Sequence, residues 1–389
     1  MKPDYVVLAA GHGKRLWPLS ETTCKPMARI LSKPVLEWTV ENALPNANKI
    51  ILVVGQLKEQ VTDYFSSKPY ADRVVFVEQP RQMGTGHALL QAEPVVESGS
   101  LVMINGDNFF HPSVFKLLAE ECIKKEWFAV TRNVADRSPY GAYYLSKGFI
   151  ERVVEKPTDG TPGPININLF HAPKSFFKLL EKIKPSPRGE IEVTDALQYF
   201  FSENRVRAID FKGYWNDIGT YWNYLDANTF ACSELMQPKI AGTIEEGAQI
   251  GGKLWLGKGS IVKAGALIQG NCFVGENCII GRGAELRGDN VVENNCTVGA
   301  AQLKSCVMLE GSKTEDGAVA TYSVLCEDSK IGRNARLSCR SKDGQTVKVN
   351  VNGKHLDSRR SELGSVIGRG IHLGENTLVA PGAIINSIE

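Results

Sequence analysis

Residues 244–303 read, in steps of six, IEEGAQ IGGKLW LGKGSI VKAGAL IQGNCF VGENCI IGRGAE LRGDNV VENNCT VGAAQL. Each step begins with an aliphatic residue: Ile244, Ile250, Leu256, Val262, Ile268, Val274, Ile280, Leu286, Val292 and Val298. If aliphatic residues fill about a third of ordinary positions, aliphatic residues at all ten first positions have a chance probability of roughly 1 in 10⁵. This figure does not allow for the freedom to choose where the count of six begins. A period of six indicates a parallel β-helix, in which each step forms one face of a triangular prism.

Small residues at the fifth position of the steps support the same prediction. They are Ala248, Ser260, Ala266, Cys272, Cys278, Ala284 and Cys296, so three cysteines are explained as small buried residues. The period lapses after Leu303 and returns at Ile331, Ile367, Leu373, Val379 and Ile385. Residues 338–362 are polar and basic without an apolar period, and we expect a loop or arm that projects from the prism.

The first ~230 residues follow a different pattern, with short apolar runs between amphipathic stretches. Strands are predicted at 5–10, 49–55, 74–78 and 101–105, and helices at 35–43, 87–92 and 112–124. Strands that alternate with helices favour an α/β fold with a parallel sheet covered on both faces. We therefore predict two domains, at residues 1–235 and 236–389.

Composition excludes several classes of protein. The 389 residues are 43% hydrophobic with a net charge of +2, which gives no reason to expect nucleic acid or a membrane as partner. The N-terminus lacks the form of a secretory signal, and no apolar stretch approaches the ~20 residues that span a bilayer. The nine cysteines contain no CxxC pair, so we expect neither zinc nor disulfides, and a reducing cytoplasm as the location.

A glycine-rich loop follows the first predicted strand. It reads Gly11-His12-Gly13-Lys14-Arg15, with Lys25 further on. Neither the dinucleotide motif GxGxxG nor the Walker motif GxxxxGK[ST] is present. The backbone N–H groups of such a loop can hold phosphates, with Arg15 and Lys25 as nearby cations. Taken as isolated residues, Arg15 and Lys25 are better explained as solvated surface charges.

The whole stretch 8–27, LAAGHGKRLWPLSETTCKPM, resembles the signature LAxGxGxRLxPLTxxxPKPL of the sugar nucleotidyltransferase family. It departs at Cys24, where a proline usually precedes the lysine, and this departure removes no functional group. The resemblance implies a Rossmann-like, mostly parallel sheet domain followed by a left-handed parallel β-helix. It also implies nucleotide binding by Ala10, Gly11 and Gly13, and catalytic roles for Arg15 and Lys25.

A second stretch resembles the base-recognition segment of uridylyltransferases that act on N-acetylglucosamine 1-phosphate. It contains Glu78-Gln79-Pro80 and Met83-Gly84-Thr85-Gly86-His87-Ala88. By that similarity Gln79 and the backbone near Gly84 read the pyrimidine edge, and Thr85 belongs to the nucleotide site. The alternative reading is a helix start capped by Thr85, and the two are compatible.

Two aspartates are implied as metal ligands. Asp107, in NGDN, follows an apolar strand, where open α/β sheets place their ligands, although a plain turn residue would read the same way. Asp217 lies in GYWNDIGT, which resembles the family segment GYWxDxGT. The resemblance makes both aspartates ligands of Mg²⁺, the expected cofactor, although 110 residues separate them.

The implied sugar contacts lie between these aspartates. Gly141, Glu155, Lys156 and Asn166 match the family elements YG, EKP and NAG. Because residues 166–168 read NIN, either Asn166 or Asn168 faces the sugar. Residues 186–195 resemble the thymidylyltransferase stretch SARGELEITD, or form a helix start with a charged surface.

These residues suggest a mechanism without a general base, because a sugar phosphate, with a second pKa of about 6, is already an anionic nucleophile. Lys25 would hold the phosphate under attack or the incoming one, and Arg15 the departing pyrophosphate. The resemblance implies UTP or dTTP, with glucose 1-phosphate or N-acetylglucosamine 1-phosphate, as the substrates. Gln79 and GTGHA favour UTP with the amino sugar, whereas SPRGE and GDN favour dTTP or UTP with glucose 1-phosphate.

Prisms of this type often form trimers, so we expect a homotrimer or larger homo-oligomer. In bifunctional relatives the prism is an acetyltransferase with a catalytic histidine, but alignment on Asp328-Ser329 puts Tyr322 at that position. His355 and His372 lie elsewhere, so a relocated base is the alternative that keeps a second activity. A third alternative is a catalytically silent regulatory paralogue, which predicts the loss of charged site residues, yet Arg15, Lys25, Asp107 and Asp217 are all present.

Overall fold

The computed structural model describes residues 2–186, 189–341 and 343–387. Contacts divide the chain into two units. Unit 1 contains Met1–His12, Thr23–Met27 and Val35–Asp217, and unit 2 contains Gly13–Thr22, Ala28–Pro34 and Ile218–Glu389. Pro187 and Arg188 of the SPRGE stretch lie outside the described residues. No helix in the described part of the chain is long and apolar enough to cross a membrane.

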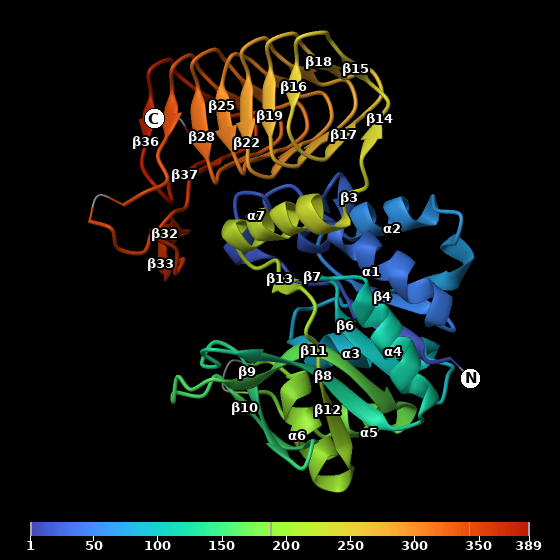
Figure 1. The fold of residues 1–389 in the computed structure, drawn as a ribbon. Coiled ribbons are helices and arrows are strands. Elements are labelled where there is room, and N and C mark those ends of the chain that lie inside the picture. Colours follow the sequence, from blue (N-terminus) through green and yellow to red (C-terminus); the bar gives the residue numbers. More distant parts are fainter. Residues whose placement is uncertain (1, 187–188, 342, 388–389) are drawn as a thin grey trace. The chain divides into compact units, whose positions relative to one another are not determined.

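Unit 1 is built on a nine-stranded sheet (Figure 1). Its order is β5 (Val74–Glu78), β4 (Ile50–Val54), β1 (Asp4–Leu8), β6 (Ser100–Asn105), β11 (Gly163–Pro173), β8 (Trp127–Val134), β12 (Val206–Asp210), β10 (Phe149–Glu155) and β9 (Gly141–Ser146). The first four strands are parallel, and only β11 and β10 run against the others. The predicted mostly parallel sheet is confirmed.

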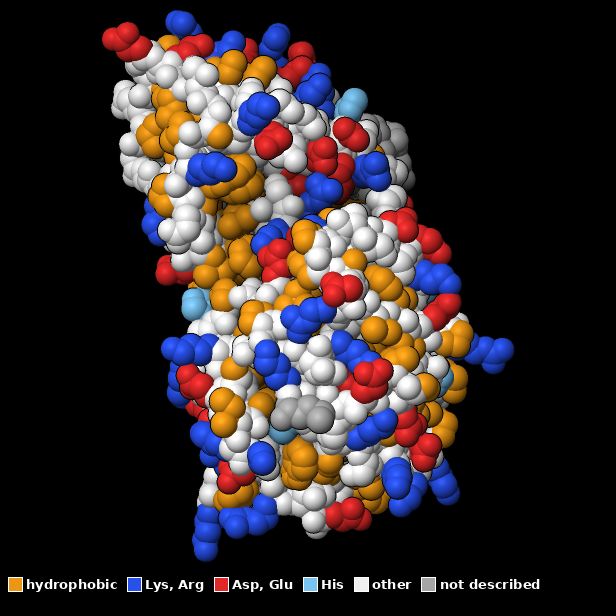
Figure 2. All heavy atoms as spheres, turned by 90° about the vertical axis from the view of Figure 1, so that its right-hand side faces the viewer, with side chains coloured by type: hydrophobic (Ala, Val, Ile, Leu, Met, Phe, Trp, Pro, Cys, Tyr) orange, Lys and Arg blue, Asp and Glu red, His pale blue; other side chains and the backbone are white. Residues whose placement is uncertain are grey.

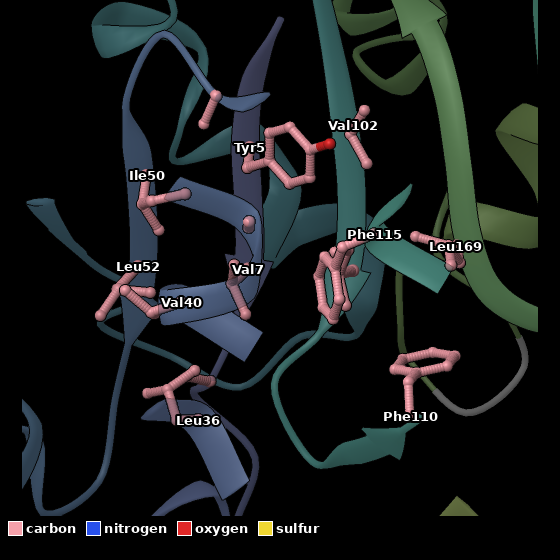
Figure 3. Close-up of a cluster of buried hydrophobic side chains, with 14 of the residues drawn as sticks. Tyr5, Val7, Leu36, Val40, Ile50, Leu52, Val102, Phe110, Phe115 and Leu169 are labelled. Atoms are coloured by element: carbon pink, nitrogen blue, oxygen red, sulfur yellow. The ribbon is translucent and has the colours of Figure 1, made fainter. Parts of the chain in front are cut away.

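Helices supply the two layers that cover this sheet. They are α1 (Val35–Ala43), α2 (Lys58–Ser66), α3 (Thr85–Leu90), α4 (Ser113–Ile123), α5 (Phe177–Leu180) and α6 (Val193–Glu203). Successive side chains of a strand point to opposite faces, so β1 contributes to two cores. Tyr5 and Val7 join one core with α1 and α4 (Figure 3), whereas Val6 and Leu8 join the other with α3 and α6. The predicted helix 35–43 is α1, and the other two helices lie within two residues of their predicted bounds.

Unit 2 contains the predicted prism, with three parallel sheets drawn from yellow to red in Figure 1. Sheet D holds β14 (Lys239–Ile240), β17 (Leu254–Leu256), β20 (Cys272–Val274), β23 (Asn290–Val292), β26 (Val307–Met308), β29 (Val324–Leu325), β34 (Val366–Ile367) and β37 (Ile384–Ile385). Sheet E holds β15 (Thr243–Ile244), β18 (Ile261–Val262), β21 (Ile279–Ile280), β24 (Thr297–Val298), β27 (Lys313–Thr314), β30 (Lys330–Ile331) and β35 (His372–Leu373). Sheet F holds β16 (Gln249–Ile250), β19 (Leu267–Gln269), β22 (Glu285–Arg287), β25 (Gln302–Lys304), β28 (Val319–Thr321), β31 (Arg336–Leu337) and β36 (Leu378–Val379).

The predicted lapse of the repeat after Leu303 is wrong, because the coils continue without a break. The inward positions are Leu303, Met308, Thr314, Ala320, Leu325, Ile331 and Leu337, all at most 2% exposed. Two of these steps, from Leu303 to Met308 and from Ala320 to Leu325, are five residues long instead of six, and two of the positions carry Thr or Ala in place of a large aliphatic residue. A five-residue step shifts the frame of the count but still turns the chain by one face of the prism, as the unbroken strand pairing shows.

The arm predicted at 338–362 is a β-hairpin, so the expectation of a segment without apolar period is wrong. Strand β32 (Lys348–Val351) pairs with β33 (Lys354–Asp357) in antiparallel register. Val347, Val349 and Val351 alternate with polar residues and are buried. A Cβ at Gly382 would meet the side chains of Val347 and Val349. The hairpin therefore packs on the last coil of the prism through one apolar face.

Sheet D also has an apolar outer face, which explains why α7 (Tyr221–Phe230) and η7 (Ala231–Leu235) belong to unit 2. The outward residues Phe273, Val291 and Val307 are at most 6% exposed. Tyr221 Oη donates a hydrogen bond to the Gly364 carbonyl at 3.0 Å, and Cys232 Sγ donates to Asn290 O at 3.5 Å. Burial of this outer row by a helix removes apolar surface from water that the repeat pattern alone would leave exposed.

Candidate active site

Three predicted residues of unit 1 meet at one point. Lys25 Nζ forms an ion pair with Asp107 Oδ2 and lies 3.1 Å from Asp217 Oδ1. Lys25 is 8% exposed, whereas the Asp107 and Asp217 side chains are 25% and 37% exposed. Two carboxylates from distant parts of the chain thus flank one buried ammonium, and both remain open to solvent on another side.

Local backbone geometry explains why the two aspartates converge. Asp107 lies between β6 and β7 (Asn108–Phe110), and Asp217 ends β13 (Trp215–Asp217). These short strands pair antiparallel with Asp217 opposite Asn108, so Asp217 lies beside the neighbour of Asp107. Gly106 N donates to the Leu8 carbonyl at 2.8 Å, which brings Asp107 to the end of β1. A Cβ at Gly106 would lie 3.1 Å from that carbonyl, so glycine permits this close approach.

The charge balance keeps Lys25 protonated. Burial acts to lower the pKa of the Lys25 ammonium, but attraction and hydrogen bonding to Asp107 and Asp217 outweigh it and raise the pKa above its usual value. A buried ammonium is tolerated only with such partners. Lys25 therefore supplies a fixed positive charge at the carboxyl edge of the sheet, where α/β enzymes bind their ligands.

The donor set suits a hard divalent cation that is completed by a substrate. In the described residues, no group of three or more His, Cys, Asp or Glu side chains is arranged to hold a metal. Mg²⁺ is usually bound by one or two carboxylates together with waters and substrate phosphates. The partly exposed oxygens of Asp107 and Asp217 fit that pattern. The Lys25 ammonium lies between them and balances the negative charge that a metal cation would also balance.

The glycine loop is divided between the two units. Ala10 and Gly11 follow the end of β1 in unit 1, and a Cβ added at Gly11 would meet no atom of the described residues within 4 Å. The backbone there faces open space, which suits close approach by a ligand. Gly13 has a left-handed backbone (φ 65°) and starts η1 (Lys14–Leu16) in unit 2. The phosphate contacts of Gly13 and Arg15 stay predictions.

The segment with Gln79 and Gly84 is a tight turn that leads into α3. Gln79 is 6% exposed, and its Nε2 donates to Gly84 O at 3.1 Å. Gly84 has φ 97°, and a Cβ there would collide with the backbone of Ile191, so this position requires glycine. Gly86 N donates to Ile191 O at 2.8 Å, and Ile191 N donates to Met83 O at 2.7 Å. The turn is thus held rigidly against the start of α6.

Thr85 does not cap its own helix, which corrects one reading of the sequence. The cap residue of α3 is Gly84, and Thr85 is the first residue of the helix. The Thr85 hydroxyl instead accepts from Val193 N and donates to Glu192 Oε2, both at 3.1 Å. It therefore satisfies a free N–H at the start of α6 and joins the two helices.

Three of the predicted sugar-binding residues lie together. Gly141 pairs with Glu155 across β9 and β10, and Ile165, next to Asn166, pairs with Ala142. A Cβ at Gly141 would lie 3.2 Å from Glu155 Oε2 and 3.5 Å from Asn166 Cβ. Lys156 follows with φ 48°, and its Nζ lies 3.7 Å from Glu155 Oε1. A side chain at residue 141 would crowd the Glu155 carboxylate, so glycine allows Glu155 and Asn166 to lie close to this backbone.

The departure at residues 166–168 has a backbone cause. Asn168 has φ 53°, a left-handed conformation that favours glycine and, among other residues, asparagine. Asn168 therefore occupies the backbone position of the family's glycine. Its N–H donates to Asn166 Oδ1 at 2.8 Å, and Asn166 Nδ2 donates to Asn168 Oδ1 at 3.1 Å. Asn166 is the more buried of the two, and Asn168 holds its amide in place.

Sequence reasoning missed two residues that hold the predicted nucleotide-binding segment. Gln82 Nε2 donates to the Ala10 carbonyl and ties this segment to the end of β1. His87 Nδ1 lies 3.1 Å from Gln79 Nε2. Gln82 and His87 lie within residues 78–88, the stretch that identified Gln79 and Gly84 as candidates. Their closeness to Gln79 and Gly84 in the sequence was the one signal that could have pointed to them. The pairing itself depends on the turn geometry.

Comparisons with known proteins agree with this architecture. The family model described as nucleotidyl transferase matches residues 4–234, and the model described as GMPPB C-terminal domain matches residues 268–388. A curated relative from Methanococcus maripaludis strain C7, named bifunctional protein GlmU, is 38% identical over 99% of this chain and 92% of its own length. A relative from Sulfurisphaera tokodaii, named bifunctional sugar-1-phosphate nucleotidylyltransferase/acetyltransferase, is 33% identical over 98% of this chain and 94% of its own length.

A solved structure of UDP-glucose pyrophosphorylase complexed with UDP-glucose is 28% identical, with a TM-score of 0.53. It covers 59% of this chain and 97% of its own chain. The first family model covers more than half of the residues, and the relatives span almost the whole length. The chain therefore belongs to the nucleotidyl transferase family.

Proposed function

We propose that the protein condenses a sugar 1-phosphate with UTP or dTTP to give a nucleoside-diphosphate sugar and pyrophosphate. The sugar 1-phosphate is glucose 1-phosphate or N-acetylglucosamine 1-phosphate. The observation that carries the proposal is the buried Lys25 ammonium between Asp107 and Asp217, beside the end of β1. The similarity to a bifunctional sugar-1-phosphate nucleotidylyltransferase/acetyltransferase and to UDP-glucose pyrophosphorylase supports the same reaction class.

The proposed mechanism depends on positioning and charge instead of on a general base. The sugar phosphate oxygen attacks the α-phosphorus of the triphosphate, and the bond to the departing pyrophosphate breaks. Lys25 neutralises charge on the phosphate under attack, Arg15 holds the pyrophosphate, and the backbone of Ala10, Gly11 and Gly13 lines the triphosphate. Mg²⁺, held by Asp107 and Asp217, supplies further charge neutralisation when bound.

The sugar and the base are recognised by separate groups. Gly141, Glu155, Lys156 and Asn166 are proposed to contact the sugar hydroxyls. Gln79, Gly84 and Thr85 are proposed to form the base pocket. We propose that residues 1–235 carry out nucleotidyl transfer and that residues 236–389 form the prism, although by their contacts α7 and η7 group with the prism.

A matrix assay tests the function directly. Pyrophosphate release is measured with four triphosphates against glucose 1-phosphate, N-acetylglucosamine 1-phosphate and glucosamine 1-phosphate, with and without Mg²⁺. We expect turnover with UTP or dTTP only when Mg²⁺ is present. No release with any pair contradicts the proposal and favours a silent sugar-nucleotide-binding paralogue.

The metal site has a test that does not depend on turnover. Removal of the ammonium in Lys25→Met leaves two facing carboxylates without their cation. We expect Mg²⁺ to raise the melting temperature of this variant more than that of the wild type, because the Lys25 ammonium then no longer competes with the metal for the carboxylates. The double variant Lys25→Met with Asp217→Asn is the control and should lose this gain. An equal shift in all three proteins would remove the metal from this position.

We further propose that the prism assembles the protein as a homotrimer or larger homo-oligomer in the cytoplasm. One observation favours a second candidate function for the prism, acetyl transfer to an amino-sugar phosphate. Outward residues of sheet E line a groove of about 590 Å³ that contains Lys313, Lys330 and His372. His372 is the one histidine there, whereas Tyr322 stands where bifunctional relatives carry theirs.

Two measurements separate these roles. Light scattering of the purified chain gives the oligomeric state, and a monomer contradicts the assembly proposal. Incubation with acetyl-CoA and glucosamine 1-phosphate tests the second activity through release of free thiol. Thiol release that depends on the amino sugar and is lost in His372→Ala supports the second candidate, and its absence leaves assembly as the role of the prism.

A further inference from the structure

The amide of Gln79 is held in one orientation by two acceptors. Its Nε2 donates to the Gly84 carbonyl at 3.1 Å and faces His87 Nδ1 at 3.1 Å. The Gln79 backbone is also fixed, because its N–H donates to Val54 O at 2.8 Å at the end of β4. With 6% of Gln79 exposed, the side chain has little freedom to choose another rotamer.

The contact determines which nitrogen of His87 carries a proton. Because Gln79 Nε2 offers only hydrogens, His87 Nδ1 must accept, and the neutral ring then carries its proton on Nε2. Gln91 Nε2 lies 3.4 Å from His87 Nε2, at the outer limit of a hydrogen bond, and donates instead to the His87 carbonyl at 3.0 Å.

Both hydrogens of Gln79 Nε2 are therefore engaged, and its one remaining polar atom is the carbonyl oxygen Oε1. A carbonyl oxygen can only accept a hydrogen bond. Uracil and thymine present an N–H donor at N3, whereas cytosine presents a lone pair at the same position. A fixed acceptor thus attracts the first two bases and repels the third, and a buried polar group left unpaired by the wrong ligand gives strong discrimination.

We propose that His87 is a positioning residue that fixes the Gln79 amide and thereby selects uracil or thymine over cytosine. This inference rests on the proposed function, in which Gln79 faces the base. His87 itself touches the amide and not the substrate. Without an acceptor at position 87, one hydrogen of Nε2 is released and the amide gains freedom to turn its nitrogen toward the base.

Two variants test this role. His87→Leu introduces an apolar side chain of similar size that offers no acceptor, whereas His87→Asn places Oδ1 near the position of Nδ1 and so keeps an acceptor. The readout is the ratio of kcat/KM for UTP to that for CTP, from pyrophosphate release. We expect this ratio to fall by roughly tenfold in His87→Leu, equivalent to about 1.4 kcal/mol, and to stay near that of the wild type in His87→Asn.

The ratio separates a positioning role from a structural one, because general damage lowers both rates together. An unchanged UTP-to-CTP ratio in His87→Leu, or a ratio lost equally in His87→Asn, overturns the inference. Failure of the proposed function is distinguishable, since the wild type then releases no pyrophosphate from any triphosphate. In that case UTP and CTP are compared by how much each raises the melting temperature of the wild type and of the two variants. Equal stabilisation of the wild type by UTP and CTP contradicts the proposed selection of uracil over cytosine.

Discussion

The prism and the active-site sheet are held by contacts of very different range. In the prism, Ile279 pairs with Thr297, and each coil meets a copy of its own pattern one turn later. At the site, Lys25 meets Asp107 across 82 positions and Asp217 across 192. The comparison teaches that a repeated local pattern specifies a core by itself, whereas a site of single residues depends on the whole path of the chain.

The largest expected effect comes from breaking the long-range cluster. Asp107→Asn and Asp217→Asn keep side-chain shape but remove one negative charge. We expect kcat to fall at least ~10³-fold in each, about 4 kcal/mol of transition-state stabilisation, while the melting curve stays cooperative. The control is Asp63→Asn on the exposed surface of α2. Turnover near that of the control in either variant would remove that aspartate from the chemistry.

The prism offers a matched pair that tests the local pattern. Ile280 is 0% exposed and points into the prism, whereas its neighbour Ile279 is 39% exposed. A carboxylate in the dry interior has no partner, so Ile280→Asp should lower the free energy of unfolding by about 4 kcal/mol or more. Ile279→Asp should lower it by less than about 1 kcal/mol. Similar urea midpoints for the two variants would contradict the inward and outward assignment.

A smaller, pH-dependent effect is expected where unit 2 buries a carboxylate. Burial raises the pKa of Glu293 to about 7, and the negative charges of Glu327 and Glu310 also raise it. The positive charge of Arg29, 3.6 Å away, acts in the opposite direction and lowers the pKa. The folded state therefore keeps a proton that the unfolded state releases above its ordinary pKa of 4.5. The contribution of Glu293 to stability is present below about pH 4.5 and is lost as the pH rises through about 7.

Glu293→Gln removes this titration. At pH 8 it should be more stable than the wild type by on the order of 1–3 kcal/mol, and near pH 4.5 the two should agree. The control is Glu310→Gln, because that side chain is 42% exposed. Denaturant unfolding at both pH values gives the difference, and a gain of equal size at pH 4.5 and pH 8 would speak against a raised pKa.

The smallest effect isolates one backbone angle in the sheet of unit 1. Asn168→Ala and Asn168→Gly both remove the amide, but only alanine retains a Cβ at φ 53°. We expect the alanine variant to be less stable than the glycine variant by about 1 kcal/mol. Thermal unfolding measures the difference. Equal stability would mean that residue 168 relaxes out of the left-handed region.

The sequence predicted the prism better than it predicted the limits of the repeat. The inward aliphatic residues from Leu256 to Val298 are fully buried, as their period indicated. Counting in steps of six residues failed after Leu303, because a step of five residues also forms one face of the prism. Likewise, the hairpin at 348–357 was not foreseen, because its buried valines become a pattern only once Gly382 offers a surface for them.

In the sheet domain, motifs identified candidate residues without showing their partners. Figure 2 shows basic and acidic side chains interspersed over the face turned to the viewer, so no concentration of one charge marks a site there. The role of Thr85 changed from its own helix to α6, because the segment at Ile191 packs against Gly84 and Gly86. The contact between Gln79 and His87 likewise follows from a turn whose geometry no spacing rule supplies.

By itself the sequence determined the two kinds of architecture, the family, and the residues on which the chemistry is proposed to depend. A period of six and an alternation of strands and helices are local patterns, so they can be recognised from the sequence alone. Only the tertiary structure decided that Lys25 is buried between Asp107 and Asp217, and that the Gln79 amide nitrogen faces Gly84 and His87. The physical reason is that hydrogen bonds and ion pairs depend on positions within a few ångströms, which the folding of distant segments against one another sets.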